Sequence, residues 1–152
     1  MKTRVTSMVI AAALTVLAVA SVAFAGGTAQ PKAAPATTTI NIVEHPINEV
    51  VTDTGKKGDS AGDLLTFHNP LFDQTNTKMI GQEQGTCVRI NPKTGAWDCA
   101  WTNFLPGGHV TVEGPFFDTH DSTVAVTGGT GSYKDVSGEM RLHAAGAVFH
   151  YT

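Results

Sequence analysis

The sequence predicts an all-β fold of about eight short antiparallel strands, closed as a barrel or packed as a sandwich. Short alternating or β-branched segments recur along the chain, and Gly- and Pro-rich turns separate them. No segment has the periodicity of an amphipathic helix. The clearest segment is 85–114, which is predicted to form three strands joined by two tight turns.

Those two turns define the register of segment 85–114. Residues 91–95 (NPKTG) and 105–108 (LPGG) each combine a proline, which fixes φ, with a glycine, which accepts a left-handed conformation. Folding about these turns sets three pairs of residues opposite one another, namely Cys87 and Cys99, Trp101 and Val112, and Asn103 and Val110.

Side chains alternate between the two faces of a strand, so this register predicts which residues point inward. One face is polar and is expected to meet solvent; it carries Thr86, Asp98, Thr102, His109, Thr111 and Glu113. The other face is mainly apolar and is expected to meet the core; it carries Gly85, Cys87, Trp97, Cys99, Trp101, Val110 and Val112.

The remaining strands are predicted from alternation and flanking turns. Residues 38–44 form the first, with Ile40 and Ile42 on one face and Val43 on the other, and His45-Pro46 ends or bulges it. Pro70 has no N–H for a ladder, so it requires a strand end, an edge or a bulge. The other predicted elements are a loop at 53–62, strands at 63–73, 78–90, 122–127, 138–145 and 147–152, a bridge at 115–120 and a loop at 128–131.

The N-terminus is predicted to be a secretory signal peptide over residues 1–25. Lys2 and Arg4 precede an apolar run, and the small-residue site at 23–25 (AFA) follows it. The run is too short for a retained membrane helix, which predicts secretion to the periplasm or the exterior without a membrane anchor. Residues 26–37 form a Gly-, Ala- and Pro-rich leader, and residues 38–152 form one domain.

The charge balance excludes two classes of partner. Removal of Lys2 and Arg4 leaves 8 basic against 13 acidic residues, a net charge of −5. Nucleic acids and anionic membranes are therefore not expected to bind.

Two cysteines in an exported chain, facing each other across a hairpin, are most simply explained by a disulfide between Cys87 and Cys99. Two reduced thiols in an apolar interior are the alternative, because a free cysteine also packs as a small hydrophobic residue.

The site residues follow from the inward face. Phe67, Trp97, Trp101 and Phe116 are core residues by default, but they would also form the walls of an apolar pocket. Asn69 and Asn103 are amides at inward positions, where a polar group needs a partner. Glu44, at the end of the first predicted strand, is the carboxylate most easily placed at a barrel mouth. No pair of the six histidines has metal-ligand spacing, so no metal site is predicted.

Several segments resemble plant allene oxide cyclase in the same order and at nearly the same spacing. They are GDLLTFHN at 62–69, GTCV at 85–88, GHVTVEGPF at 108–116, VTGGTGSY at 126–133 and Leu142-His143. Dirigent proteins, which share that barrel, are similar but show a weaker pattern. The resemblance implies an eight-stranded antiparallel β-barrel around an apolar cavity, without a cofactor, assembled as a homotrimer.

The resemblance also implies roles for individual residues. Allene oxide cyclase folds an unstable allene oxide into a cyclopentenone of one handedness by positioning and electrostatics. Asn69 matches the family's water-holding asparagine, Cys87 a cavity cysteine and Trp101 an aromatic position. The family's Glu-x-Asn motif is absent, because His45-Pro46 follows Glu44, and a Cys87–Cys99 bond would occupy the cavity thiol.

The sequence therefore predicts a secreted barrel that binds a small hydrophobic molecule in a cavity that includes Phe67, Trp101, Asn103 and Val112. One hypothesis is a cofactor-free isomerase or stereocontrol protein for a reactive epoxide or radical, with Glu44 and Asn69 orienting charge. The alternatives are a non-catalytic carrier or dirigent-like scaffold, and a structural domain whose barrel is filled by its own side chains.

Overall fold

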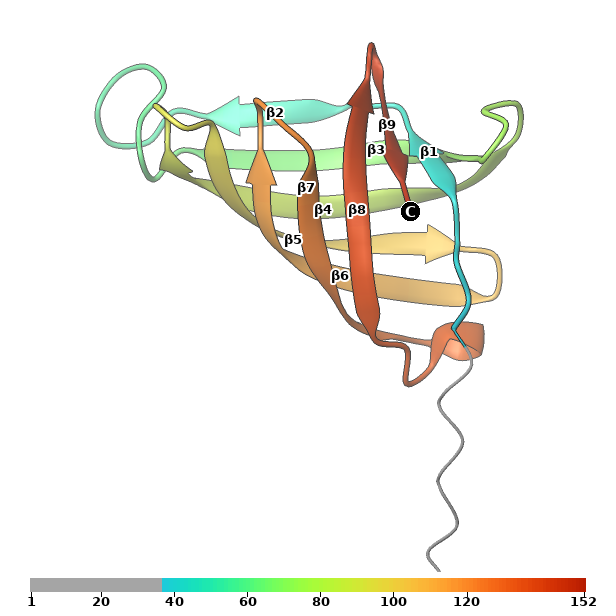
Figure 1. Cartoon of the computed structure of the whole chain (residues 1–152). Helices are drawn as coiled ribbons and strands as arrows, with labels where there is room; N and C mark the ends of the chain where they lie inside the picture. The colour runs from blue at the N-terminus through green and yellow to red at the C-terminus, as the bar shows by residue number, and fades with distance from the viewer. Residues whose placement is uncertain (1–36) are drawn as a thin grey trace, which may run out of the picture. The chain divides into compact units, whose positions relative to one another are not determined.

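A computed structural model of the chain describes residues 37–152, which form an all-β domain (Figure 1). The predicted signal peptide and nearly all of the predicted leader lie outside the described residues. No helix within residues 37–152 is long and apolar enough to cross a membrane. The strands are β1 (Ile42–Glu44), β2 (Glu49–Thr52), β3 (Leu64–Asp73), β4 (Met79–Asn91), β5 (Ala96–Leu105), β6 (Gly108–Phe117), β7 (Ser122–Gly129), β8 (Gly138–Ala145) and β9 (Val148–Tyr151).

The strands form one antiparallel sheet that closes on itself. Its order is β1-β9-β8-β7-β6-β5-β4-β3-β2, and β1 also pairs with β3 (Figure 1). β1 pairs with β3 at Leu71 to Asp73 and β2 pairs with β3 at Leu64 to Phe67, so β1 and β2 are two halves of one interrupted strand. Counted in this way, the predicted eight-stranded antiparallel barrel is confirmed, and closure decides between barrel and sandwich.

The first predicted strand is longer than the observed one. β1 holds only residues 42–44, and Ile40 lies before it with 38% of its surface exposed. Val43 was assigned to the face opposite Ile42, yet both side chains are buried. β1 is paired along both of its edges, with Phe72 and His150 beside Val43. β2 was not predicted at all.

Pro70 lies within β3, where a proline normally breaks a ladder. The interruption between β1 and β2 falls opposite it, because β1 ends at Leu71 and β2 begins at Phe67 in the β3 register. A bulge follows directly, between Leu71 and Phe72. The expectation of an edge or bulge position for Pro70 is therefore confirmed.

The double hairpin has the predicted register. Cys87 pairs with Cys99, Trp101 with Val112 and Asn103 with Val110. Gly95 in the first turn has φ of 70° and Gly107 in the second has φ of 95°, values that favour glycine. The inward face forms the centre of the core, which contains Cys87, Trp97, Cys99, Trp101, Val110 and Val112 together with Ile42, Leu71, Val124, Met140, Leu142 and Tyr151.

Two predicted boundaries are wrong. The bridge at 115–120 begins inside β6, which continues to Phe117 because residues 115–117 pair with β5. The loop at 128–131 begins inside β7, because Gly128 and Gly129 pair with Thr111 and Val110. Glycine is disfavoured in strands, but a β-carbon at Gly129 would lie 2.3 Å from the carbonyl oxygen of Tyr133, so only glycine fits there.

The predicted disulfide between Cys87 and Cys99 is present, with the two Cα atoms 4.0 Å apart. The open alternative of two reduced thiols is therefore excluded.

Replacement of both cysteines by alanine is expected to lower the free energy of unfolding by about 2 to 3 kcal/mol, since the bond closes a short loop in the unfolded chain. Urea denaturation with and without reductant tests this. Reductant should bring the wild type to the stability of the double variant and leave the double variant unchanged. A wild type that loses nothing on reduction would contradict the prediction.

Candidate functional site: a buried carboxyl pocket

A small pocket of about 40 Å³ lies inside the barrel, among aromatic side chains and three glutamates. We call it the carboxyl pocket. Leu65, Phe67, Phe116 and Phe149 are only partly buried and form its rim toward solvent. The residues that line it are Glu44, Glu49, Leu65, Phe67, Glu83, Cys87, Cys99, Trp101, Phe116, Leu142, Phe149 and Tyr151.

Glu44, at the end of β1, accepts two hydrogen bonds inside the barrel. Asn69 Nδ2 donates to Glu44 Oε1 at 2.6 Å, and the Tyr151 hydroxyl donates to Glu44 Oε2. Asn69 Oδ1 in turn accepts the backbone N–H groups of Ile47 at 3.1 Å and Asn48 at 2.9 Å. These bonds fix the orientation of the Asn69 amide, so the residues between β1 and β2 hold the donor that faces Glu44.

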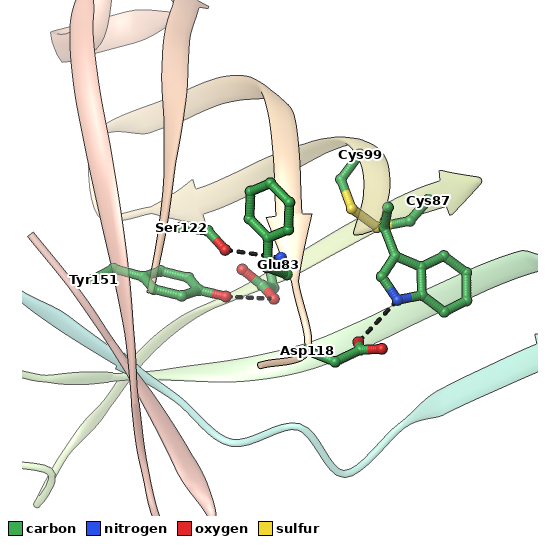
Figure 2. Close-up of a disulfide and its surroundings, with 8 residues drawn as sticks. Glu83, Cys87, Cys99, Asp118, Ser122 and Tyr151 are labelled. Atoms are coloured by element: carbon green, nitrogen blue, oxygen red, sulfur yellow. Dashed lines mark hydrogen bonds between the residues drawn. A yellow bond between two sulfur atoms is a disulfide. The ribbon is translucent and has the colours of Figure 1, made fainter. Parts of the chain in front are cut away.

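Glu83 is the least compensated carboxyl group of the pocket. It is fully buried on β4, between Asn69 of β3 and Asn103 of β5 in the sheet register. Its Oε1 lies 3.3 Å from the Tyr151 hydroxyl (Figure 2), and its Oε2 has no hydrogen-bond partner among residues 37–152. The single hydroxyl proton of Tyr151 goes to Glu44, which leaves Glu83 without a donor adequate for a buried anion.

This geometry favours the protonated form of Glu83. Burial, and then the negative charge of Glu44, raise the pKa of Glu83 well above its ordinary value of 4.5. Burial, and then the charges of Glu83 and Glu44, raise the pKa of Tyr151 well above 10.0, so the phenol stays neutral. Burial and Glu44 also raise the pKa of Glu49 at the rim. The pocket therefore offers acidic protons in apolar surroundings.

The aromatic wall of the pocket depends on a glycine. Phe67 and Trp101 meet edge to face over Gly85, with ring centroids 6.2 Å apart. A β-carbon at Gly85 would lie 2.3 Å from Trp101 Cβ and 2.8 Å from Phe67 Cζ. Trp101 Nε1 is buried and has no partner, so it is a second polar atom of the pocket wall that a ligand oxygen would satisfy.

The other predicted site residues lie apart from the carboxyl pocket. Asn103 lines a second, larger pocket. Neither Trp97 nor Val112 is among the described residues that line either pocket. Trp97 packs under Arg89, whose guanidinium carbon lies 4.1 Å from the ring centroid. Asp118 accepts a hydrogen bond from Trp97 Nε1 at 2.9 Å (Figure 2). Val112 is a core residue beside Trp101.

Two central residues of the pocket were missed from the sequence. Glu83 lies two residues before Gly85 and four residues before Cys87. Because every second side chain of a strand lies on the same face, alternation alone places Glu83 on the inward face. Tyr151 pairs with Leu142 within the β8–β9 hairpin, but its contact with Glu44 depends on the pairing of β9 with the distant strand β1, which has no local signal in the sequence. Within residues 37–152, no three His, Cys, Asp or Glu side chains group as metal ligands.

In this protein a single sheet closes around a pocket that contains carboxyl groups. The protein therefore belongs to the class of small β-barrels that enclose a cavity. Residues 39–151 match the family described as allene oxide cyclase, and the chain belongs to that family.

Solved structures share the barrel. A pyocyanin demethylase is 24% identical over 74% of this chain and 97% of its own, with a TM-score of 0.65. The pterocarpan synthase dirigent protein PsPTS1 is 16% identical over 73% of this chain and 88% of its own, with a TM-score of 0.61. AbnU, an exo-specific intermolecular Diels-Alderase, is 15% identical over 72% of this chain and 92% of its own, with a TM-score of 0.55. These similarities support the fold.

Proposed function

We propose that this protein is a cofactor-free isomerase that binds a small hydrophobic molecule with a reactive oxygen group, an epoxide of the allene oxide type, and directs its cyclisation. The observation that carries the proposal is Glu83, a buried carboxyl group whose Oε2 has no partner and which lines an apolar pocket. An unpaired buried polar atom is costly, so it is retained where it has a use.

The chemistry required is charge stabilisation. As the C–O bond of the epoxide opens, negative charge develops on the oxygen and positive charge on the carbon chain. Protonated Glu83 and Trp101 Nε1 donate hydrogen bonds to that oxygen, and the Glu44 carboxylate stabilises the cation. Ring closure consumes both charges, so the proton stays on Glu83 and no atom is gained or lost.

The pocket size limits which part of the substrate is held there. A volume of about 40 Å³ accepts the oxygen and a few neighbouring atoms, well below the several hundred Å³ typical of a complete ligand site. The partly exposed side chains of the rim, Phe67, Phe116 and Phe149, must turn aside for the rest of the molecule. Their packing would select the conformer that cyclises.

The test is chiral analysis of the cyclopentenone formed when purified protein is added to freshly generated allene oxide. The wild type is expected to give an excess of one enantiomer. Glu83→Leu should slow the directed reaction by roughly 100-fold, the usual cost of losing one hydrogen-bond donor to a developing oxyanion. Asn69→Ala should reduce the enantiomeric excess, because Asn69 positions Glu44. Glu113→Gln, an exposed change on β6, is the matched control.

A racemic product from the wild type would exclude this substrate. Equal rates for the wild type and Glu83→Leu would remove Glu83 from the mechanism. The second candidate function is a non-catalytic carrier or dirigent-like scaffold, which is favoured by the larger pocket that Asn103 lines. It predicts retention of a ligand without turnover.

We further propose that the protein is exported and assembles as a homotrimer. The Cys87–Cys99 bond supports export, because disulfides persist in oxidising compartments.

Assembly as a trimer is supported by exposed apolar side chains on the neighbouring strands β2, β3 and β4, namely Val50, Leu64 and Val88. Light scattering after size-exclusion chromatography, with Val88→Asp as the disrupting variant, tests the trimer.

A further inference from the structure

A second pocket, with a volume of about 410 Å³, lies next to the carboxyl pocket, and Tyr151 lines both. We call it the Asn103 pocket. Its inner wall is apolar and consists mainly of Leu105, Val110, Val126 and Met140. Residues 37–40, Ile42 and residues 136–141 border it. This volume is within the range of small-molecule sites, whereas the carboxyl pocket is about one tenth as large.

Asn103 is the polar anchor of this pocket. Its side chain is 1% exposed, and its Oδ1 has no hydrogen-bond partner within the described part of the chain. A buried amide without a partner costs on the order of 1 to 3 kcal/mol. The other buried polar side chain that lines the pocket, Tyr151, already donates its proton to Glu44. Asn103 is therefore the buried group with hydrogen-bonding capacity left for a ligand.

The charges at the buried end of the pocket favour a neutral ligand. The charged residues that line the rest of it, Glu139 and Arg141, are exposed, and Arg141 is paired with Asp121. Asn103 lies directly opposite Glu83 in the sheet, and Tyr151 separates the pocket from the Glu44 carboxylate. A ligand anion at this depth would be repelled by Glu44 and would lose its hydration. A hydroxyl group satisfies the Asn103 oxygen without either cost.

We propose that the Asn103 pocket is a second binding site, separate from the carboxyl pocket, for a neutral and largely apolar molecule with one hydroxyl group, an alcohol or a phenol. The hydroxyl donates to Asn103 Oδ1, and the apolar body packs against Val110, Val126 and Met140. This site does not depend on the cyclisation chemistry proposed for Glu83.

Two probes of similar size test the site, 2-naphthol and 2-methoxynaphthalene, which lacks the donor. Calorimetric titration of the wild-type protein should show 2-naphthol binding on the order of tenfold more tightly. In Asn103→Leu this preference should disappear, while 2-methoxynaphthalene binds as before. The unchanged affinity for the second probe is the control that the pocket remains folded.

A measurement on the wild type alone guards against a variant that does not fold. The methyl resonances of Val110, Val126 and Met140 should shift when 2-naphthol is added. Shifts confined to Leu65 and Leu142 of the carboxyl pocket would overturn the proposal. So would equal affinity of the wild type for the two probes, or no binding of 2-naphthol. None of these results bears on whether Glu83 directs cyclisation, so the two proposals fail separately.

Discussion

Glu83→Gln is expected to make the protein more stable at pH 8 and to flatten the decline of its stability as the pH rises above 4.5. The folded state raises the pKa of Glu83 above its ordinary value of 4.5 through burial and the charge of Glu44. Above pH 4.5 the unfolded chain releases this proton while the folded protein keeps it. The free energy of unfolding of the wild type therefore falls as pH rises, until the folded-state pKa is passed.

The slope for one such group approaches about 1.4 kcal/mol per pH unit. Glutamine is similar in shape and does not ionise, so this decline should be absent from the variant. Glu49 contributes a decline of the same sign in both proteins. The lowered pKa values of Asp63, Asp73 and Asp121 remove stability only as pH falls into the acid range, outside this interval.

Urea denaturation at a series of pH values measures the effect. Glu113→Gln is the control, because it removes a carboxyl group from the exposed face of β6. It should leave the wild-type pH dependence in place. A Glu83→Gln variant whose stability declines with pH as steeply as that of the wild type would show that Glu83 is ionised in the folded protein.

Gly85→Ala is expected to lower the free energy of unfolding by about 3 kcal/mol, at the upper end of the usual cost of overpacking. The new β-carbon would lie 2.3 Å from Trp101 Cβ and 2.7 Å from the carbonyl oxygen of Ala100. Neither atom is at the end of a flexible side chain, so β5 must move away from β4. The Phe67–Trp101 contact that walls the carboxyl pocket would be lost with it.

Gly128→Ala is the matched control, since its β-carbon would meet only Thr111 Oγ1, at an ordinary contact distance of 3.5 Å. It should be neutral or slightly stabilising, because alanine restricts the unfolded chain more than glycine does. The midpoint of urea unfolding and the near-UV circular dichroism of the tryptophans report the two effects. Equal stabilities of the two alanine variants would contradict the account of Gly85.

Local sequence rules determined the central hairpins. Proline and glycine place the turns at 91–95 and 105–108, and strand alternation then decides which side chains face the core. The opposed pairs Cys87–Cys99 and Trp101–Val112 follow from counting residues away from each turn. These contacts are close in sequence, so short-range geometry is sufficient to predict them.

The catalytic candidates depend on contacts between distant parts of the chain. Glu44 and Tyr151 are separated by 107 positions and meet because β1 pairs with both β3 and β9 when the barrel closes. Asn69 was predicted to lie inside, but its bonds to the backbone between β1 and β2, and so its hold on Glu44, require the interruption opposite Pro70.

The protonation of Glu83 was likewise decided by the tertiary structure. Its inward position can be read from strand alternation, but its pKa is raised because the closed barrel removes water from it and places Glu44 nearby. The sequence by itself determined the all-β pattern, the register of the hairpins and the disulfide pair. Only the tertiary structure brought two carboxyl groups, an amide and a phenol together, because burial and long-range charge belong to the whole fold and not to any one strand.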